Sequence, residues 1–274
     1  MSYNSQDLKG LGRPFRPEQA ILSVSGLSFS YNGPEKGVLH DLSLQVPAGA
    51  VTAILGPNGS GKTTLLRLLL GVLRPHAGGI SLAGRPLGSY SRRERSRLVG
   101  LVPQDEHIPF DFSVLEYVLL GRAPYLGPLQ MPGEADRQVA LAALRTAGQA
   151  GLEHRSLPTL SGGERQLATL ARALAQQPKI LLLDEPMAHL DLGNQGRLLS
   201  ILRELAAQGT TLVLTTHDPS LAAFVAGFAV LIRDGRILAT GPAETTLTAE
   251  KLSATYDAPV QVFQVDGRRV ILLS

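Results

Sequence analysis

Two stretches near the beginning of the chain alternate apolar with polar residues. They cover Ile21–Tyr31 and Val38–Val46, and Asn32-Gly33-Pro34 lies between them. A period of two residues is typical of strands that bury one face, and the intervening tripeptide is typical of a turn. This part of the chain therefore predicts an antiparallel β layer.

Further along, apolar runs without alternation are followed by segments of helical periodicity. Ala50–Leu55 and Ile180–Leu183 are continuous runs and Thr211–Leu214 is nearly so, which is typical of parallel strands covered on both faces. Because strands and helices alternate over much of the chain, the pattern predicts an α/β fold. The predicted helices are Lys62–Leu73, Gly133–Ala147, Gly162–Gln176 and Leu192–Gln208.

The pattern changes between Gln104 and Leu160, where no strand signal occurs. Ser113–Gly121 and Glu134–Ala150 have helix-like apolar spacing, so we expect a helical subdomain over about 105–165, inserted into the sheet domain. At the carboxyl end, apolar strands flank Asp266-Gly267 and predict a β-hairpin over about 259–273. We expect a single domain over 19–274, preceded by a flexible tail over 1–18.

The composition of the chain excludes several classes of protein. The 274 residues include no cysteine, which excludes disulfides, thiolate metal sites and cysteine catalysis. The 26 Lys and Arg side chains barely exceed the 23 Asp and Glu side chains, so no nucleic acid is expected as a partner. The longest apolar stretch, Leu221–Ile232, predicts one buried element, since it is shorter than the roughly 20 residues that span a bilayer. The amino-terminal residues carry no export signal, and a cytoplasmic location is expected.

One small cluster of positive charge precedes Val99. Arg92, Arg93, Arg95 and Arg97 lie on a short helix-like segment. We interpret the cluster as a solvated cationic face. Contact with anionic lipid headgroups is the alternative.

The first motif with candidate chemistry follows the predicted strand that ends at Leu55. Residues 56–63 read GPNGSGKT and match G-x-x-x-x-G-K-[ST] between a strand and a helix, which is the pattern of a phosphate-binding P-loop. Glycines let the backbone N–H groups face inward, and the helix directs its positive end at the same point. We expect Lys62 to reach the β- and γ-phosphates and Thr63 to bind Mg²⁺. The candidate nucleotide-binding residues are Gly56, Pro57, Asn58, Gly59, Ser60, Gly61, Lys62, Thr63 and Thr64.

A second motif points to the same chemistry. The apolar strand Ile180–Leu183 ends in Asp184 and Glu185. At the carboxyl end of a parallel strand, Asp184 is expected to face the Mg²⁺, and Glu185 is expected to face the γ-phosphate and a water molecule. Taken alone, the same residues before Pro186 would be a solvated acidic turn.

A third motif gives the resemblance to a family. Leu160-Ser161-Gly162-Gly163-Glu164 predicts a capped helix start with Ser161 and Glu164 in a capping box. The same pentapeptide is similar to the signature of ATP-binding cassette (ABC) systems, and with the other motifs the chain resembles their nucleotide-binding subunits. That resemblance implies an ABC cassette of the P-loop NTPase class: a mixed, largely parallel core sheet, an antiparallel β subdomain and a helical subdomain. It also implies that Ser161, Gly162 and Gly163 serve the ATP held by a second copy.

The resemblance assigns roles to four more positions. Gln104 looks like the glutamine that touches Mg²⁺ or the attacking water, and His217 looks like the histidine at the γ-phosphate. Tyr31 resembles the aromatic residue that stacks on adenine, although a structural tyrosine at a strand edge is the alternative. Asp191 matches the aspartate after the acidic strand end. Ala188 departs from the family, which commonly has serine there, and lacks its hydroxyl.

The kind of ABC system also follows from resemblance. Residues 112–122 and 189–195 are similar to importer ATPases for iron chelates, haem, cobalamin or molybdate, and only one cassette is present. We expect an ATPase that energises uptake of an iron-siderophore, haem or cobalamin; a molybdate or tungstate importer and a soluble ATPase of Fe–S cluster assembly are the alternatives. The resemblance implies ATP and Mg²⁺ as cofactors. The implied partners are a second copy in an ATP-sandwich dimer, membrane permease subunits and, indirectly, a substrate-binding protein, with the chain on the cytoplasmic face of the membrane.

Overall fold

The computed structural model describes residues 20–31, 33, 37–106, 108, 110–188, 190–265 and 268–273. The predicted tail over 1–18, most of the first turn and the turn at Asp266-Gly267 lie outside these residues. The chain divides into two compact units, and the division into one domain with a helical insertion over 105–165 stays a prediction. Unit 1 comprises Met1–Leu65, Arg74–Pro86 and Thr216–Ser274, and unit 2 comprises Leu66–Leu73 and Leu87–Thr215.

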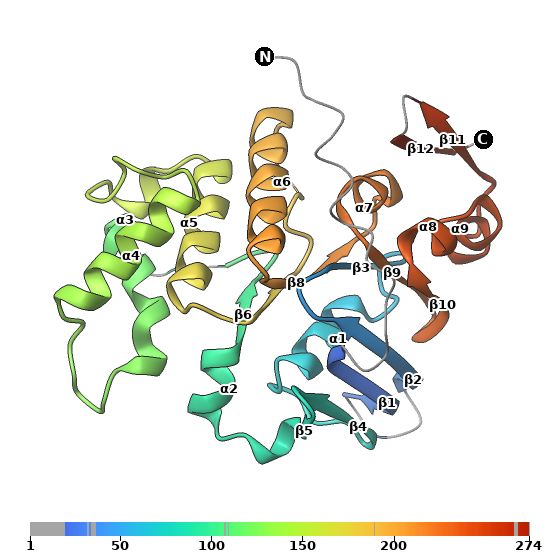
Figure 1. Ribbon diagram of the computed structural model, residues 1–274, viewed down its shortest axis with the longest axis horizontal. Coiled ribbons are helices and arrows are strands. Elements are labelled where there is room, and N and C mark those ends of the chain that lie inside the picture. The colour runs from blue at the N-terminus through green and yellow to red at the C-terminus, as the bar shows by residue number, and fades with distance from the viewer. Residues whose placement is uncertain are drawn as a thin grey trace. The chain divides into compact units, whose positions relative to one another are not determined.

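Unit 1 contains the predicted antiparallel layer (Figure 1). Its order is β2-β1-β4-β5, and all neighbours are antiparallel. The alternation in β2 is confirmed, since Leu42, Leu44 and Val46 are buried and the residues between them are not. β4 was not predicted, because its first residues are Ala-Gly-Gly and carry no apolar alternation. The bounds are β1 Ala20–Ser30, β2 Gly37–Pro47, β4 Ala77–Leu82 and β5 Arg85–Pro86.

Unit 1 also holds strands of a mixed sheet. β3 (Val51–Leu55) pairs in parallel with β9 (Phe228–Arg233), and β9 pairs antiparallel with β10 (Arg236–Pro242). The prediction of one buried element over Leu221–Ile232 is wrong. The stretch divides into helix α7 (Pro219–Val225) and strand β9, and the chain leaves the helix at Ala226 in extended conformation.

The carboxyl end of unit 1 forms two short helices and a hairpin. The strands β11 (Val260–Val265) and β12 (Arg268–Leu273) pair antiparallel, which confirms the predicted strands. Ser220 of α7 donates a hydrogen bond to the Ile271 carbonyl at 3.0 Å. The helices are α8 (Ala243–Thr246) and α9 (Ala249–Tyr256).

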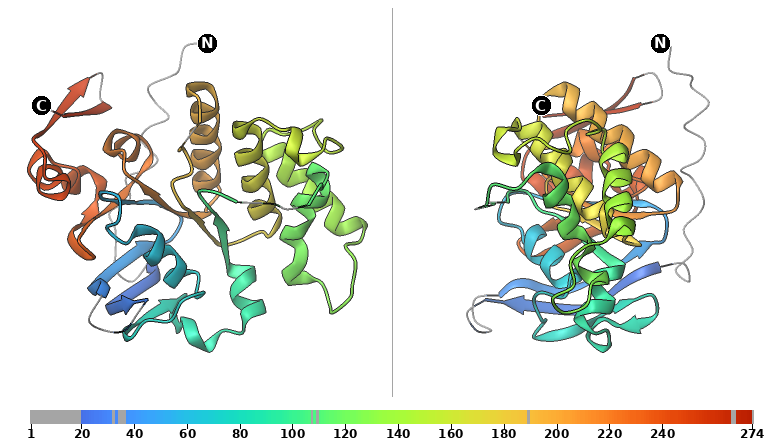
Figure 2. Two further views of the ribbon diagram at one scale, coloured as in Figure 1. Left: turned by 180° about the vertical axis from the view of Figure 1, so that it is seen from behind. Right: turned by 90° about the vertical axis from the view of Figure 1, so that its left-hand side faces the viewer.

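Unit 2 contains three parallel strands and most of the helices (Figures 1 and 2). β7 (Ile180–Leu183) lies between β6 (Val99–Val102) and β8 (Thr211–Thr216), and all three are parallel, as the apolar runs predict. The predicted helices appear as α4 (Glu134–Thr146), α5 (Gly162–Ala175) and α6 (Leu192–Ala207). α3 (Val114–Leu119), α4 and α5 pack around one apolar core. In the described part of 104–160 the only β pairing is the isolated bridge Ser113–Ser156.

One predicted helix is shorter than expected. α1 ends at Leu69 and not at Leu73, because Gly71 takes a left-handed φ of 75°. The Val72 N–H donates to the Arg67 carbonyl at 3.0 Å and the Gly71 N–H donates to the Leu68 carbonyl at 2.9 Å. These are the two bonds of a Schellman helix end.

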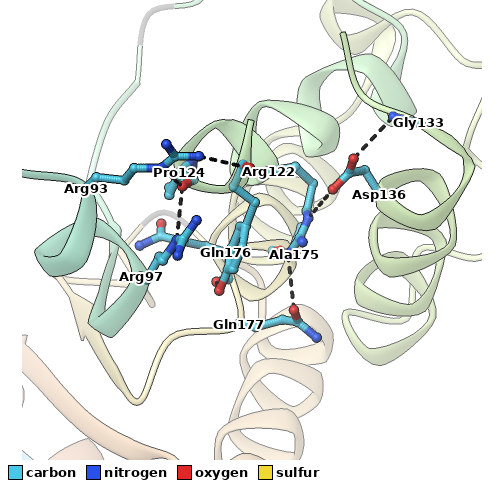
Figure 3. A network of polar contacts seen from close by, with 10 residues as sticks. Arg93, Arg97, Arg122, Pro124, Gly133, Asp136, Ala175, Gln176 and Gln177 are labelled. Atoms are coloured by element: carbon cyan, nitrogen blue, oxygen red, sulfur yellow. Dashed lines mark hydrogen bonds and ion pairs between the residues drawn. The ribbon is translucent and has the colours of Figure 1, made fainter. Parts of the chain in front are cut away.

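The arginines before Val99 lie on the predicted helix, α2 (Arg92–Leu98). Arg92, Arg93 and Arg97 are exposed, as a solvated face requires, but two of them also make specific hydrogen bonds (Figure 3). Arg93 and Arg97 each donate to the Pro124 carbonyl, at 2.9 and 3.1 Å. Pro124 belongs to the 3₁₀ helix η5 (Leu120–Tyr125). The guanidinium groups thus hold α2 against η5, since they satisfy carbonyls that a short helix leaves unpaired.

Candidate functional site

The P-loop of unit 1 is shaped by three glycines. A methyl group at Gly56 would stand 2.0 Å from the Ile232 carbonyl oxygen of β9, and one at Gly61 would stand 2.5 Å from Leu39 Cδ2. Gly59 and Gly61 have φ values of 79° and 99°, which disfavour residues with a Cβ. Only glycine lets the loop lie this close to the sheet while it turns.

Lys62 lies over this loop and is buried. Its ammonium donates to the carbonyls of Gly56 at 2.8 Å and Pro57 at 3.1 Å. The Ser60 hydroxyl is also buried and has no hydrogen-bond partner among the described residues. A loop with a buried cation, an unpartnered hydroxyl and no acidic residue in the first turn of α1 fits a polyphosphate.

Tyr31 follows β1 and is tied to the same helix. Its hydroxyl lies 3.2 Å from Thr64 Oγ1, and its ring packs edge-on against Phe29 with centroids 5.0 Å apart. Phe29 stacks on His76. Because 51% of Tyr31 remains exposed, its ring is fixed in orientation and open to a planar ligand.

The acidic strand end of unit 2 is organised by Thr215. The Thr215 hydroxyl donates to Asp184 Oδ1 at 2.7 Å and accepts the Glu185 N–H at 2.9 Å. Asp184 is buried, and its N–H donates to the Val102 carbonyl at 2.9 Å. Thr215 therefore fixes both carboxylate-bearing residues. Sequence reasoning missed it, although two threonines directly before His217 were the available signal.

The signature segment begins α5 as predicted. Ser161 Oγ accepts the Glu164 N–H at 3.2 Å, and Glu164 Oε2 accepts the Ser161 N–H at 2.8 Å, so the capping box is confirmed. Hydrogen bonds from the backbone and the hydroxyl of Ser161 hold the pKa of Glu164 below its ordinary value. Arg155 lies 3.2 Å from the same carboxylate.

Gly163 and Asp191 are brought together through Asn194. A methyl group at Gly163 would stand 2.3 Å from Asn194 Nδ2. Asn194 is held by Asp191, whose carboxylate accepts the Asn194 N–H and its amide, each at 2.8 Å. Asn194 is thus a positioning residue that sequence reasoning missed, and it links the start of α6 to the start of α5.

The two remaining predicted residues follow strand ends. Gln104 is exposed and follows β6 after one intervening residue, Pro103. His217 is exposed and follows β8, and the next residue, Asp218, caps α7 by accepting the Ser220 N–H at 2.8 Å. Nucleotide and metal contacts of the predicted site residues stay predictions.

Similarity to known proteins agrees with this geometry. Residues 39–188 match the ABC transporter family, so the chain belongs to that family and is an ATP-binding cassette ATPase. The predicted fold class is thereby confirmed. None of the helices in the described part of the chain has the length and apolar content to cross a membrane.

Three similar proteins cover most of the chain. The hemin import ATP-binding protein HmuV of Gloeobacter violaceus is 41% identical over 86% of this chain and 87% of its own. The probable iron chelatin transport ATP-binding protein of Helicobacter pylori is 36% identical over 92% of this chain and 98% of its own. A metal-chelate type ABC transporter solved in an inward-facing conformation has a TM-score of 0.81 and 36% identity, over 93% of this chain and 97% of that chain.

Proposed function

We propose that this chain hydrolyses ATP to energise uptake of a metal chelate: an iron-siderophore, haem or cobalamin. The observation that carries the ATPase chemistry is the glycine-shaped P-loop with its buried Lys62. The chelate class is supported by the relatives named for hemin and iron chelatin transport.

Each predicted site residue is assigned a role in ATP binding or hydrolysis from its position. The P-loop amides and Lys62 bind the phosphates, and the exposed ring of Tyr31 stacks on adenine. Thr63, Gln104 and Asp184 would hold Mg²⁺, which neutralises charge on the phosphates. Glu185 takes the proton of the attacking water, and His217 contacts the γ-phosphate.

ABC cassettes function as dimers with membrane permease subunits. We propose that Ser161, Gly162 and Gly163 contact the ATP of the second copy, and that Asp191 lies near that contact. Permease subunits on the cytoplasmic face of the membrane and a substrate-binding protein complete the system.

The catalytic assignment is tested with Glu185→Gln. The change keeps the side-chain shape and removes the basic carboxylate, so turnover should fall by about 10² to 10⁴-fold while ATP binding persists. An ATP-dependent dimer should accumulate in size-exclusion chromatography with Mg²⁺. Adding Ser161→Arg should abolish that dimer without loss of ATP binding by the monomer. Turnover at the wild-type rate in Glu185→Gln would show that another group is the base.

The substrate is tested in proteoliposomes that contain the chain, its permease and its binding protein. ATP-dependent uptake of a ferric siderophore, haem or cobalamin supports the proposal, and uptake of molybdate or tungstate alone supports the first alternative. Copurification with soluble scaffold proteins in place of a permease supports the Fe–S assembly alternative.

We propose that the permease docks on the segment over 105–122, which follows Gln104 and contains none of the proposed catalytic residues. An exposed apolar residue of this segment provides the test. Leu120→Glu is the suitable change, because Leu120 is 47% exposed. Glu116 is unsuitable, since its carboxylate accepts the Ser113 N–H at 2.7 Å and caps α3. We expect lost uptake with basal ATPase retained; intact uptake would place docking elsewhere.

A further inference from the structure

Three aromatic rings are in contact at the end of β1 in unit 1. The ring centroid of Phe29 lies 5.0 Å from that of Tyr31, with the ring planes 87° apart, and 5.5 Å from that of His76, with the planes 11° apart. Edge-to-face and offset parallel arrangements are the favourable geometries of aromatic pairs. Because Phe29 is buried, it relates the position of the Tyr31 ring to that of His76.

His76 also contacts the backbone that leads into Tyr31. His76 Nε2 lies 2.9 Å from the Ser30 carbonyl oxygen and 3.1 Å from Ser30 Oγ. Since a carbonyl oxygen only accepts, Nε2 carries a proton and donates it to this oxygen. The Ser30 carbonyl belongs to the planar peptide group that joins Ser30 to Tyr31. The hydrogen bond therefore restricts the direction in which the chain enters Tyr31.

The imidazole supplies a donor at the point where the β ladder stops. The pairing of β1 with β4 ends at Ser28 and Ala77, and the His76 N–H donates to the Ser28 carbonyl at 2.9 Å. Ser30 lies beyond this pairing and is 3% exposed. A buried carbonyl without a donor costs free energy. The His76 side chain removes that cost and thereby extends the order of β1 up to Tyr31.

The Tyr31 ring is thus held at both of its ends. Its hydroxyl lies 3.2 Å from Thr64 Oγ1 of α1, and its backbone end is held through Ser30 and Phe29 by His76. Without His76, the ring would keep the Thr64 contact and gain freedom at the backbone. A ring that is already fixed loses less freedom when a ligand binds, which raises the affinity.

We infer that His76 is a positioning residue for the base-stacking ring of Tyr31. It acts through the Ser30 carbonyl and the Phe29 ring, and it raises the affinity for ATP without contacting the phosphates. The inference rests on the proposed function, in which Tyr31 stacks on adenine. It adds to the nucleotide site a residue that lies 45 positions beyond Tyr31 in the sequence.

The first test compares two ligands on the full chain by calorimetry, each with Mg²⁺. His76→Ala should weaken ATP binding about fivefold, the effect of losing one ordinary hydrogen bond. Inorganic triphosphate, measured by competition with ATP, has no base and should bind His76→Ala and the wild type equally. An equal loss for both ligands would show a general effect on the P-loop and would overturn the inference.

The second test repeats His76→Ala in a chain that carries Tyr31→Ala. If His76 acts through the Tyr31 ring, removing that ring leaves nothing to position, and the double variant should bind ATP with the affinity of Tyr31→Ala alone. Residues that act on the same contact give such non-additive effects, whereas independent residues give additive ones. An additive loss would show that His76 acts independently of Tyr31, and would overturn the inference.

Two conservative variants separate the contacts of His76. His76→Gln keeps an amide donor for the Ser30 carbonyl, and His76→Phe keeps a ring against Phe29. At least one of them should bind ATP more tightly than His76→Ala does. Recovery in neither variant would show that neither contact positions the ring, and would overturn the inference. If His76→Ala does not fold, His76→Thr, which also removes the ring, replaces it in every comparison.

Val72→Ala is the matched control. Val72 lies in the same connection between α1 and β4 and is 68% exposed, so this change truncates a neighbouring side chain without removing a contact of Tyr31, Phe29 or Ser30. Its ATP affinity should be that of the wild type. An equal loss in Val72→Ala and His76→Ala would overturn the inference, because any disturbance of this connection would then suffice.

The outcomes distinguish failure of the inference from failure of the proposed function. If Tyr31→Ala weakens ATP binding and His76→Ala does not, the inference alone fails and the proposed function stands. If Tyr31→Ala binds ATP as the wild type does, the stacking role and the inference both fail, while the P-loop assignment stands. If the wild type does not bind ATP, the proposed function is overturned together with the inference.

Discussion

The amino-terminal ends of α1 and α5 are built in opposite ways. α1 begins with a glycine loop, a buried lysine and no acidic residue in its first turn. α5 begins with a serine cap and Glu164, whose carboxylate accepts a backbone N–H that a phosphate would otherwise take. Both ends have the positive side of a helix dipole, but only α1 is left open to an anion by its own side chains.

The difference indicates an order of binding. A phosphate approaching α1 meets donors and a cation, whereas one approaching α5 meets a negative charge that is already hydrogen-bonded there. We therefore expect the α1 site to bind nucleotide in a single chain. In the proposed function, the α5 site would add its donors only when a second copy brings a phosphate that is already held, because the P-loop cation has then partly neutralised it.

The largest effect is expected from Lys62→Ala, which changes only the α1 site. Removing the only lysine of the loop should greatly weaken ATP binding by the single chain in calorimetry and abolish turnover, because the phosphates lose their point charge. Ser161→Ala, which changes only α5, should leave single-chain binding intact. Near-normal hydrolysis in Lys62→Ala would refute the P-loop assignment.

A smaller effect is expected from the base-stacking side of the α1 site. Tyr31→Ala should weaken ATP binding by about 1 to 3 kcal/mol, the range for an aromatic ring stacked on a base. Tyr31→Phe keeps the ring and loses only the contact with Thr64, so its effect should be smaller. Equal affinity of Tyr31→Ala and the wild type in calorimetry would make Tyr31 a structural residue.

The two helix starts should also differ in their tolerance of a methyl group. In Gly56→Ala the new Cβ meets backbone at 2.0 Å, and in Gly163→Ala it meets the Asn194 side chain at 2.3 Å. Backbone cannot move aside, so Gly56→Ala should lower the free energy of unfolding by about 1 to 3 kcal/mol and Gly163→Ala by less. Denaturant unfolding of both purified variants measures the difference, and the reverse order would contradict it.

The smallest effect concerns pH at the start of α5. The pKa of Glu164 is lowered in the folded chain, so its contribution to stability is present above the unfolded pKa of about 4.3 and is lost as the pH falls through the lower folded value. Thermal unfolding of Glu164→Gln should lack this part of the acid dependence seen in the wild type. Identical acid profiles would show that the capping box contributes nothing.

Local patterns were enough to predict much of the fold. Apolar runs predicted β3, β7 and β8, and Ser161 with Glu164 predicted the start of α5. Patterns failed where one apolar stretch serves two elements, as at Leu221–Ile232, and where glycines replace apolar residues, as in β4. The end of α1 depended on the left-handed φ of Gly71, which a helical pattern does not contain.

For the candidate site, the sequence predicted the motif residues and missed the residues that position them. Sequence motifs carry the residues that are proposed to meet nucleotide, because those residues recur at fixed spacing. The residues that hold them, such as Thr215 and Asn194, act through contacts between elements far apart in sequence. No local pattern encodes those contacts. The same is true of Arg93 and Arg97, whose carbonyl partners lie on η5.

The backbone at Glu185 takes an unfavourable conformation. Glu185 has a φ of 45°, in the left-handed region that costs a residue with a Cβ about 1 to 2 kcal/mol. A glycine there would relax the chain and remove the carboxylate. In the proposed function this carboxylate is the general base, so selection for turnover would retain a residue that selection for stability alone would replace. Position 185 would then be a compromise between stability and chemistry.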